Sequence, residues 1–244
     1  MAVGGDSEAT GGERRAEPTR EQRGGKQRIP RPENFRPGRP APWGSLDPAR
    51  RRFTLDEVRA RLALYPPVAG PIPWSENATA AAVLVPLFES DGEVSVVLTR
   101  RPETMPSHQG EIAFPGGKHD AAVDTDLRAT ALREAQEEIG LDPASVEIVA
   151  RLEGLPTAAG AFTIAPFVGF IADEPELVPD PREVARVFSV PLSELMAEDV
   201  FREEVWDTWR MDLDIQFYEL VDETVWGATA RILTGFLAHL VTGR

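Results

Sequence analysis

The chain has 244 residues, of which 42% are hydrophobic, and it contains no cysteine. This length and composition suffice for a sizeable hydrophobic core, and the lack of cysteine excludes disulfides, zinc–thiolate sites and cysteine nucleophiles. Residues 1–52 hold 12 Lys/Arg against 7 Asp/Glu, whereas residues 53–244 hold 14 against 33. So acidic a body argues against a nucleic-acid partner, because non-specific binding to nucleic acid needs a basic surface.

The beginning of the chain is charged and rich in glycine, where a signal peptide would need an apolar run, and no stretch of 18 apolar residues occurs. We therefore expect a cytoplasmic protein with no membrane partner. Residues 1–45 have few apolar side chains to bury and predict a disordered basic tail. Its arginines could contact RNA, a membrane or the acidic body, but a solvated extension is the favoured interpretation. Residues 46–244 are interpreted as a single domain.

The first half of the body predicts a short helix and a hairpin. Thr54 and Glu57 form a capping box that begins a helix. The apolar run 78–88 predicts a buried strand, and Asp91-Gly92 a hairpin turn into a second strand over 93–99. A short extended segment, 112–114, then leads into Pro115-Gly116-Gly117.

The second half alternates further strands with helices. A helix pattern precedes Gly140, and the remaining elements follow from their periodicity and from proline positions: strands at Val146–Leu152, Phe162–Ile171 and Val184–Val190, a short helix at Pro191–Leu195, a hairpin of Val205–Trp209 with Ile215–Leu220, and a closing amphipathic helix at Thr229–Leu240.

The helix before Gly140 carries a crowded acidic face. Glu134, Glu137 and Glu138 are spaced i, i+3 and i+4, so they share one face, opposite an apolar face with Leu132, Ala135 and Ile139. Like charges at these spacings repel by a few tenths of a kcal/mol per pair. Mg²⁺ or Mn²⁺ would offset this repulsion, because both prefer carboxylate, water and phosphate oxygens. A solvated acidic surface is the alternative interpretation.

Other candidates surround this helix. Gly116 and Gly117 have no Cβ, so their backbone can approach a metal or phosphate closely. Arg100 and Arg101 follow a predicted strand and are candidate phosphate ligands, although exposed arginines are common. His108, on the loop that follows, is a weaker candidate for contact with a substrate.

The segment Arg133–Leu141, REAQEEIGL, resembles the second half of the signature of the Nudix hydrolases without a mismatch. The first half matches if its loop is two residues longer than usual, which makes Gly117 the signature glycine and Asp124 the acidic residue. The segments 98–110 and 114–117 resemble the additional signature of the coenzyme A diphosphatase branch. Pro102 and Pro106 depart from that second signature.

The resemblance implies an α/β fold, an α/β/α sandwich around a mixed sheet. It implies that Glu134, Glu137 and Glu138 bind Mg²⁺ or Mn²⁺, and that Arg133 pairs with Asp124 to orient them. These five residues are the expected catalytic residues, with Arg100, Arg101, Gly116 and Gly117 as substrate-binding residues. The implied reaction is hydrolysis of the diphosphate bond of coenzyme A or an acyl derivative to 3′,5′-ADP and a 4′-phosphopantetheine.

Several alternatives stay open at this point. The substrate is a nucleotide-linked small molecule, and a nucleotide sugar or dinucleotide is the alternative to coenzyme A. A non-catalytic module that senses a nucleotide is a second alternative. A carboxylate near the metal would accept the proton of the attacking water, and Glu137, Glu138 and Glu183 are candidates. A homodimer is also left open.

Overall fold

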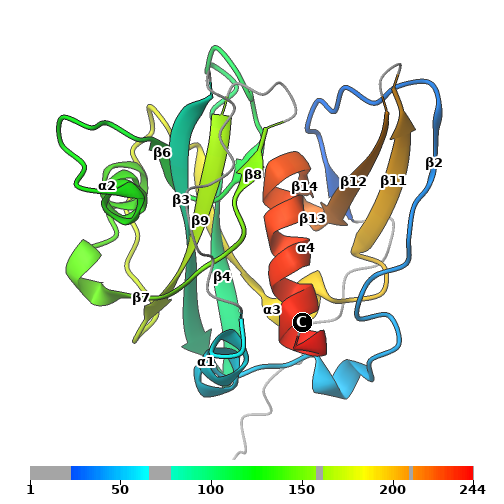
Figure 1. Cartoon of the computed structure of the whole chain (residues 1–244), viewed down its shortest axis with the longest axis horizontal. Helices are drawn as coiled ribbons and strands as arrows, with labels where there is room; N and C mark the ends of the chain where they lie inside the picture. The colour runs from blue at the N-terminus through cyan, green and yellow to red at the C-terminus, as the bar shows by residue number, and fades with distance from the viewer. Residues whose placement is uncertain (1–22, 66–77, 158–161, 209–210, 244) are drawn as a thin grey trace, which may run out of the picture.

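The computed structural model describes residues 23–65, 78–157, 162–208 and 211–243. A large sheet stands between two helices: α2 (Leu127–Ile139) covers one face and α4 (Gly227–Thr242) the other, and a smaller sheet lies beyond α4 (Figure 1). The predicted α/β/α sandwich around a mixed sheet is confirmed. The additional layer beyond α4 was not predicted.

The larger sheet contains eight strands within the described ranges: β3 (Thr79–Ser90), β4 (Glu93–Arg100), β5 (Ile112–Ala113), β6 (Gly116–Lys118), β7 (Val146–Arg151), β8 (Leu155–Pro156), β9 (Phe162–Ile171) and β10 (Arg186–Pro191). The main order is β10-β4-β3-β9-β7, in which β3 and β9 are parallel and the other neighbours antiparallel. β5 pairs with the end of β4, and β6 with the beginning of β3. The chain between β5 and β6 thus crosses from one strand to the other beneath α2.

The helices begin and end close to the predicted positions. At α1 (Leu55–Leu62), the Thr54 hydroxyl accepts from the Glu57 N–H, and the Glu57 side chain accepts from the Thr54 N–H, which confirms the capping box. The other short elements are α3 (Leu192–Leu195) and two 3₁₀ turns, η2 (Pro48–Arg50) and η3 (Pro143–Ser145). No helix in the described residues is both long and apolar enough to span a bilayer.

The smaller sheet is built around the predicted C-terminal hairpin. Its strands, in the described part of the chain, are β2 (Phe35–Pro37), β11 (Phe201–Asp207), β12 (Asp212–Glu219) and β14 (Thr224–Trp226). β1 (Gly24–Gly25) and β13 (Val221–Asp222) form a separate parallel pair. The hairpin is confirmed in β11 and β12, although Trp209 lies outside the described residues.

The prediction of a disordered tail is wrong for residues 23–45, and residues 1–22 lie outside the described ranges. β2 pairs with β11, and Arg39 contacts the buried carboxylate of Glu203 at 3.0 Å. Arg31 forms an ion pair with Glu204, which is also buried. The apolar content that normally orders a segment is low here, so charge supplies the contact: arginines of the basic segment neutralise carboxylates of the acidic body.

The core has two parts, one on each face of the larger sheet. The larger part lies between that sheet, α1, α4 and β12, and includes Leu98, Tyr218 and Phe236. The smaller part lies under α2 and includes Val97 and Ile139. Successive residues of β4 therefore point to opposite parts, as expected for a strand buried on both faces.

Candidate active site

The acidic helix α2 is fixed at both ends and along one side. The Asp126 side chain accepts from the Ala129 N–H at 2.8 Å, and Gly140 ends the helix in the left-handed conformation with φ of 68°. Ala135 and Ile139 are buried against the sheet. With this side packed, the glutamates emerge along the side of α2 that borders β6.

The three glutamates have different environments. Glu138 is buried, whereas the Glu137 side chain is 57% exposed and that of Glu134 15% exposed. The Gly116 N–H donates to Glu138 Oε2 at 3.0 Å. The predicted acidic face therefore runs from the border of β6 out to solvent.

The glycines of β6 make room for these carboxylates. A Cβ on Gly117 would lie 2.4 Å from Glu134 Oε2, and a Cβ on Gly116 would lie 2.4 Å from the Ala82 carbonyl oxygen. Both separations are far shorter than van der Waals contact, so a side chain at 117 would displace the Glu134 carboxylate, and one at 116 would force the strand away from β3. The close backbone approach expected from the sequence is thus observed, toward a carboxylate.

Arg133 connects the loop before α2 to the glutamates. Its Nε and Nη2 donate to the two oxygens of Asp124 at 2.8 and 3.0 Å, so the pairing that the resemblance implies is present and is bidentate. Its Nη1 lies 2.8 Å from Glu134 Oε1 and 2.9 Å from Glu137 Oε2. One guanidinium therefore sets the position of two acidic side chains.

Asp124 is buried and held as an anion. The Arg133 guanidinium holds the pKa of the Asp124 carboxyl well below its usual range, helped by the Asp120 N–H and the Thr130 hydroxyl. His119 Nδ1 in turn lies 2.9 Å from Thr130 Oγ1. Sequence reasoning missed Thr130 and His119; a threonine four residues after the helix N-cap was the available signal, because such a hydroxyl often bonds locally.

Two glutamates of the cluster resist ionisation. Burial is the main reason that the pKa of Glu138 is raised to about 7; the negative charges of Glu134 and Glu183 act in the same direction, and the Gly116 N–H and Arg101 oppose them. Burial also raises the pKa of Glu134, although Arg133 opposes the shift. The site thus concentrates more negative charge than its cations neutralise.

This excess of negative charge fits a divalent cation. In the described residues, no three His, Asp or Glu side chains are already gathered around a point where a metal could sit, and Glu137 turns toward Arg133. The carboxylates of Glu134 and Glu138 are nevertheless desolvated and lie beside β6. A hard cation would relieve their mutual repulsion and take their oxygens as ligands.

The two candidate phosphate-binding arginines have different neighbours. Arg101 acts on Glu138, whose pKa its charge lowers, and its buried Nε has no hydrogen-bond partner among the described residues. Arg100 instead donates from Nη1 to Glu223 at 3.1 Å, on the side of the smaller sheet. Only Arg101 therefore shares the surroundings of the acidic helix.

The remaining candidate, His108, lies elsewhere. It contacts Glu111 at 2.8 Å on the exposed loop after β4. No hydrogen bond or ion pair joins His108 to the acidic helix among the described residues.

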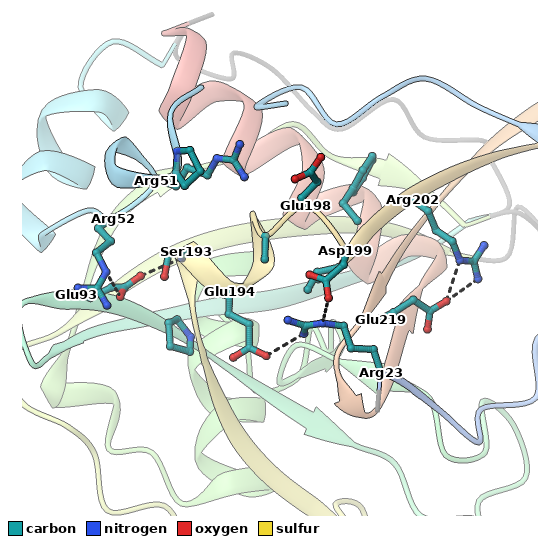
Figure 2. Close-up of a pocket in the computed structure, with 15 residues that line it drawn as sticks. Arg23, Arg51, Arg52, Glu93, Ser193, Glu194, Glu198, Asp199, Arg202 and Glu219 are labelled. Atoms are coloured by element: carbon teal, nitrogen blue, oxygen red, sulfur yellow. Dashed lines mark hydrogen bonds and ion pairs between the residues drawn. The ribbon is translucent and has the colours of Figure 1, made fainter. Parts of the chain in front are cut away.

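A cavity of about 1130 Å³ lies away from this site, between α3, η2 and the beginning of β11 (Figure 2). Its charged walls are largely paired internally: Arg23 contacts Asp199 at 2.7 Å, and Arg52 contacts Glu93 at 3.2 Å. None of its lining residues belongs to α2 or β6. The cavity is therefore not the candidate site, which the unneutralised carboxylates place at α2 and β6.

Comparisons with known proteins match the chain to one family. Residues 78–209 match the model of the NUDIX domain. The chain is 39% identical over 160 residues to Nudix hydrolase 22, chloroplastic, of Arabidopsis thaliana, covering 63% of this chain and 52% of that protein. It is 35% identical over 175 residues to the uncharacterized Nudix hydrolase NudL of Photorhabdus laumondii, covering 72% and 90%.

A third relative is the peroxisomal coenzyme A diphosphatase NUDT7 of Mus musculus, 35% identical over 201 residues, which cover 82% of this chain and 83% of the mouse protein. The chain thus spans about half the length of the Arabidopsis relative and most of the other two. The matched NUDIX region contains the acidic helix, the glycines of β6 and Asp124. The chain therefore belongs to the Nudix hydrolase family.

Proposed function

We propose that this Nudix hydrolase cleaves the diphosphate bond of coenzyme A or an acyl derivative, with Mg²⁺ or Mn²⁺, to 3′,5′-ADP and a 4′-phosphopantetheine. The observation that carries the proposal is the desolvated pair Glu134 and Glu138 beside Gly116-Gly117, with Arg101 acting on the same carboxylate. The substrate is supported by the branch signature in residues 98–117 and by the similarity to the mouse coenzyme A diphosphatase.

In this proposal the chain's own residues hold and orient the reacting groups. A divalent cation, when bound, neutralises the negative charge that develops on the phosphoryl oxygens. Glu134 and Glu138 would hold it, with Glu137 completing the set after release from Arg133. Arg133 fixes Glu134 in place, and the buried Asp124 fixes Arg133. The guanidinium of Arg101, whose charge acts on Glu138, would bind a phosphate oxygen of the substrate.

Glu183 is our choice among the three candidate proton acceptors. Glu138 is bonded to the Gly116 N–H and Glu137 to Arg133. Glu183 lies on the exposed loop before β10, and its charge acts on both Glu134 and Glu138. It is therefore near the cluster without belonging to the helix that would hold the cation, and it can accept a proton from the attacking water.

The test is a substrate panel with purified protein and either Mg²⁺ or Mn²⁺: coenzyme A, an acyl-coenzyme A, ADP-ribose, a nucleotide sugar and a dinucleotide. We expect the highest kcat/KM for a coenzyme A compound, with 3′,5′-ADP identified by mass spectrometry. The variant Glu183→Gln should lower kcat by about 10²-fold or more and leave Mn²⁺ affinity unchanged.

Three results would contradict parts of the proposal. Efficient cleavage of another panel member, without cleavage of coenzyme A, would identify that nucleoside diphosphate derivative as the substrate instead. Binding without turnover of any member would favour a nucleotide-sensing module. Full activity of Glu183→Gln would return the proton acceptor to Glu137 or Glu138. The cytoplasmic location and the homodimer stay predictions from the sequence.

A further inference from the structure

Arg100 and Arg186 are direct neighbours at one edge of the larger sheet. They are register partners in the antiparallel pairing of β4 with β10, and the Ala185 N–H donates to the Arg100 carbonyl at 2.8 Å. The side chain of Arg100 is 37% exposed and that of Arg186 45% exposed. Like charges on paired residues repel, so this arrangement needs an anion between them.

Glu223 supplies part of that negative charge. Its Oε1 accepts from Nη1 of Arg100 at 3.1 Å and from Nη1 of Arg186 at 3.0 Å, while its side chain is only 1% exposed. Gln27 Nε2 donates to the other oxygen of Glu223 at 2.7 Å. Glu223 is thereby fixed from three sides, and it fixes both guanidinium groups in turn.

The cluster retains an unneutralised positive charge. Two guanidinium groups share one carboxylate, and the side-chain hydrogen bonds of both arginines within the described residues go to Glu223 through Nη1. Each therefore keeps other N–H groups for a further acceptor, on a side chain that solvent reaches. Two preorganised arginines with free donors are suited to the several oxygens of a phosphate group.

The cluster is also close to the candidate active site. Arg100 precedes Arg101, and their Cα atoms are about 3.8 Å apart. Arg186 follows Glu183 by three residues, a span of at most about 11 Å in extended chain. The charges of Arg101 and Glu183 both influence the carboxyl group of Glu138. The arginine pair and the acidic helix thus flank the same strand end, one on each side.

We propose that Arg100 and Arg186 form a second anion subsite, which binds a phosphate monoester of the substrate other than the diphosphate that is cleaved. The inference rests on the proposed function, because coenzyme A carries a 3′-phosphate on the same ribose as its diphosphate. Glu223 and Gln27 act as positioning residues that hold the two guanidinium groups toward this phosphate. The subsite would discriminate substrates with the additional phosphate from those without it.

The test compares coenzyme A with 3′-dephospho-coenzyme A, which differ by this one phosphate, on wild type, Arg186→Gln and Arg186→Lys. We expect Arg186→Gln to raise KM for coenzyme A about tenfold, with kcat within about twofold, and to leave KM for the dephospho compound unchanged. Arg186→Lys, which keeps the charge, should recover part of the affinity. Arg231→Gln removes the same charge from an exposed position of α4 and should change neither KM.

A binding measurement separates this inference from the proposed function. Calorimetry with 3′,5′-ADP and 5′-AMP should show tighter binding of 3′,5′-ADP to wild type and no such preference in Arg186→Gln, whether or not coenzyme A is cleaved. Equal binding of the two nucleotides to wild type, or an equal rise in KM for both substrates in Arg186→Gln, would overturn the subsite. Failure of wild type to cleave either coenzyme A compound would overturn the proposed function alone.

Discussion

At the scale of single residues, charge and burial oppose each other most directly at Glu138. The residue is 4% exposed, and its hydrogen bond from the Gly116 N–H only partly replaces water. Without a cation, a charged carboxylate in such a place destabilises the folded protein, because burial removes its hydration. A cluster of this kind favours ligand binding over stability of the unliganded protein, a common feature of functional sites.

This cost predicts how the metal-free protein responds to pH. The pKa of Glu138 is about 7 when folded, above its ordinary 4.5, so the folded state binds more protons than the unfolded state between these values. The contribution of Glu138 to the free energy of unfolding is therefore fully present below about pH 4.5 and is lost as the pH rises through 7. Glu138→Gln should raise the free energy of unfolding at pH 8 by up to about 3 kcal/mol.

The measurement is urea unfolding in EDTA at pH 5 and pH 8. The gain of Glu138→Gln over wild type should be large at pH 8 and small at pH 5. Glu137→Gln, on the same helix with an exposed side chain, is the matched control and should show no comparable gain. Equal stability of Glu138→Gln and wild type at both pH values would contradict the burial cost.

The Arg133–Asp124 pair makes a second prediction at this scale. Arg133→Gln leaves Asp124 as a buried, uncompensated anion and should cost about 3–5 kcal/mol of unfolding free energy. Adding Asp124→Asn should recover part of that loss, because the stranded charge disappears. A double-mutant cycle measures the coupling, and a coupling energy near zero would mean that the ion pair does not position the helix.

At the scale of elements, β6 and α2 form one unit. Gly116 and Gly117 bring the strand close enough for backbone and carboxylate to meet, and the crossing from β5 to β6 aims this strand beneath the helix. The spacing of the glutamates along α2 places them on one side, but only the approach of β6 buries Glu138. The geometry of the candidate site is therefore a property of the strand and the helix together.

Gly117→Ala tests this unit. Its Cβ would lie 2.4 Å from Glu134 Oε2, so Glu134 must leave its position beside Arg133. We expect kcat/KM to fall at least tenfold and Mn²⁺ affinity to weaken. Gly235→Ala on α4 is the control, because its Cβ would meet nothing within 4 Å; it should keep full activity and gain up to about 1 kcal/mol of stability. Normal Mn²⁺ affinity in Gly117→Ala would contradict the close-approach role.

At the scale of the whole molecule, opposite charges join the basic beginning of the chain to its acidic body. Arg23 contacts Asp199 and Arg39 contacts Glu203, and the uncharged Gln27 adds a hydrogen bond to Glu223. Because Glu203 and Glu223 are buried, these contacts compensate carboxylates that water does not reach. The segment closes the smaller sheet and supports the edge of the larger sheet where Arg100 and Arg186 lie.

Truncation should reveal this role. Removal of residues 1–39 takes Arg39 away from the buried Glu203 and Arg31 away from the buried Glu204, and should lower the free energy of unfolding by at least about 3 kcal/mol. Removal of residues 1–22 deletes none of the described contacts and serves as the matched control. Thermal unfolding of both truncated proteins is the measurement. Equal melting temperatures for the two would show that residues 23–39 contribute nothing to the fold.

The sequence by itself determined the elements whose signals are local. The capping box at Thr54, the turn at Asp91-Gly92 and the helix end at Gly140 each depend on residues within a few positions, and all three are observed. The acidic cluster was equally accessible, because i, i+3 and i+4 spacing fixes a helix face whatever surrounds it. The family resemblance rests on that same short segment.

Only the tertiary structure decided which charges meet across the chain. Arg23 and Asp199 are 176 residues apart, and Arg31 and Glu204 are 173 residues apart. The composition of residues 1–45 could not reveal that their arginines would pair with buried carboxylates. A disordered tail was therefore predicted where residues 23–45 are ordered. The divergence of Arg100 and Arg101 likewise depends on what packs against each face of β4. Helix and turn signals depend on neighbouring residues and can be read from the sequence. Charge complementarity between distant segments exists only once the backbone has brought them together.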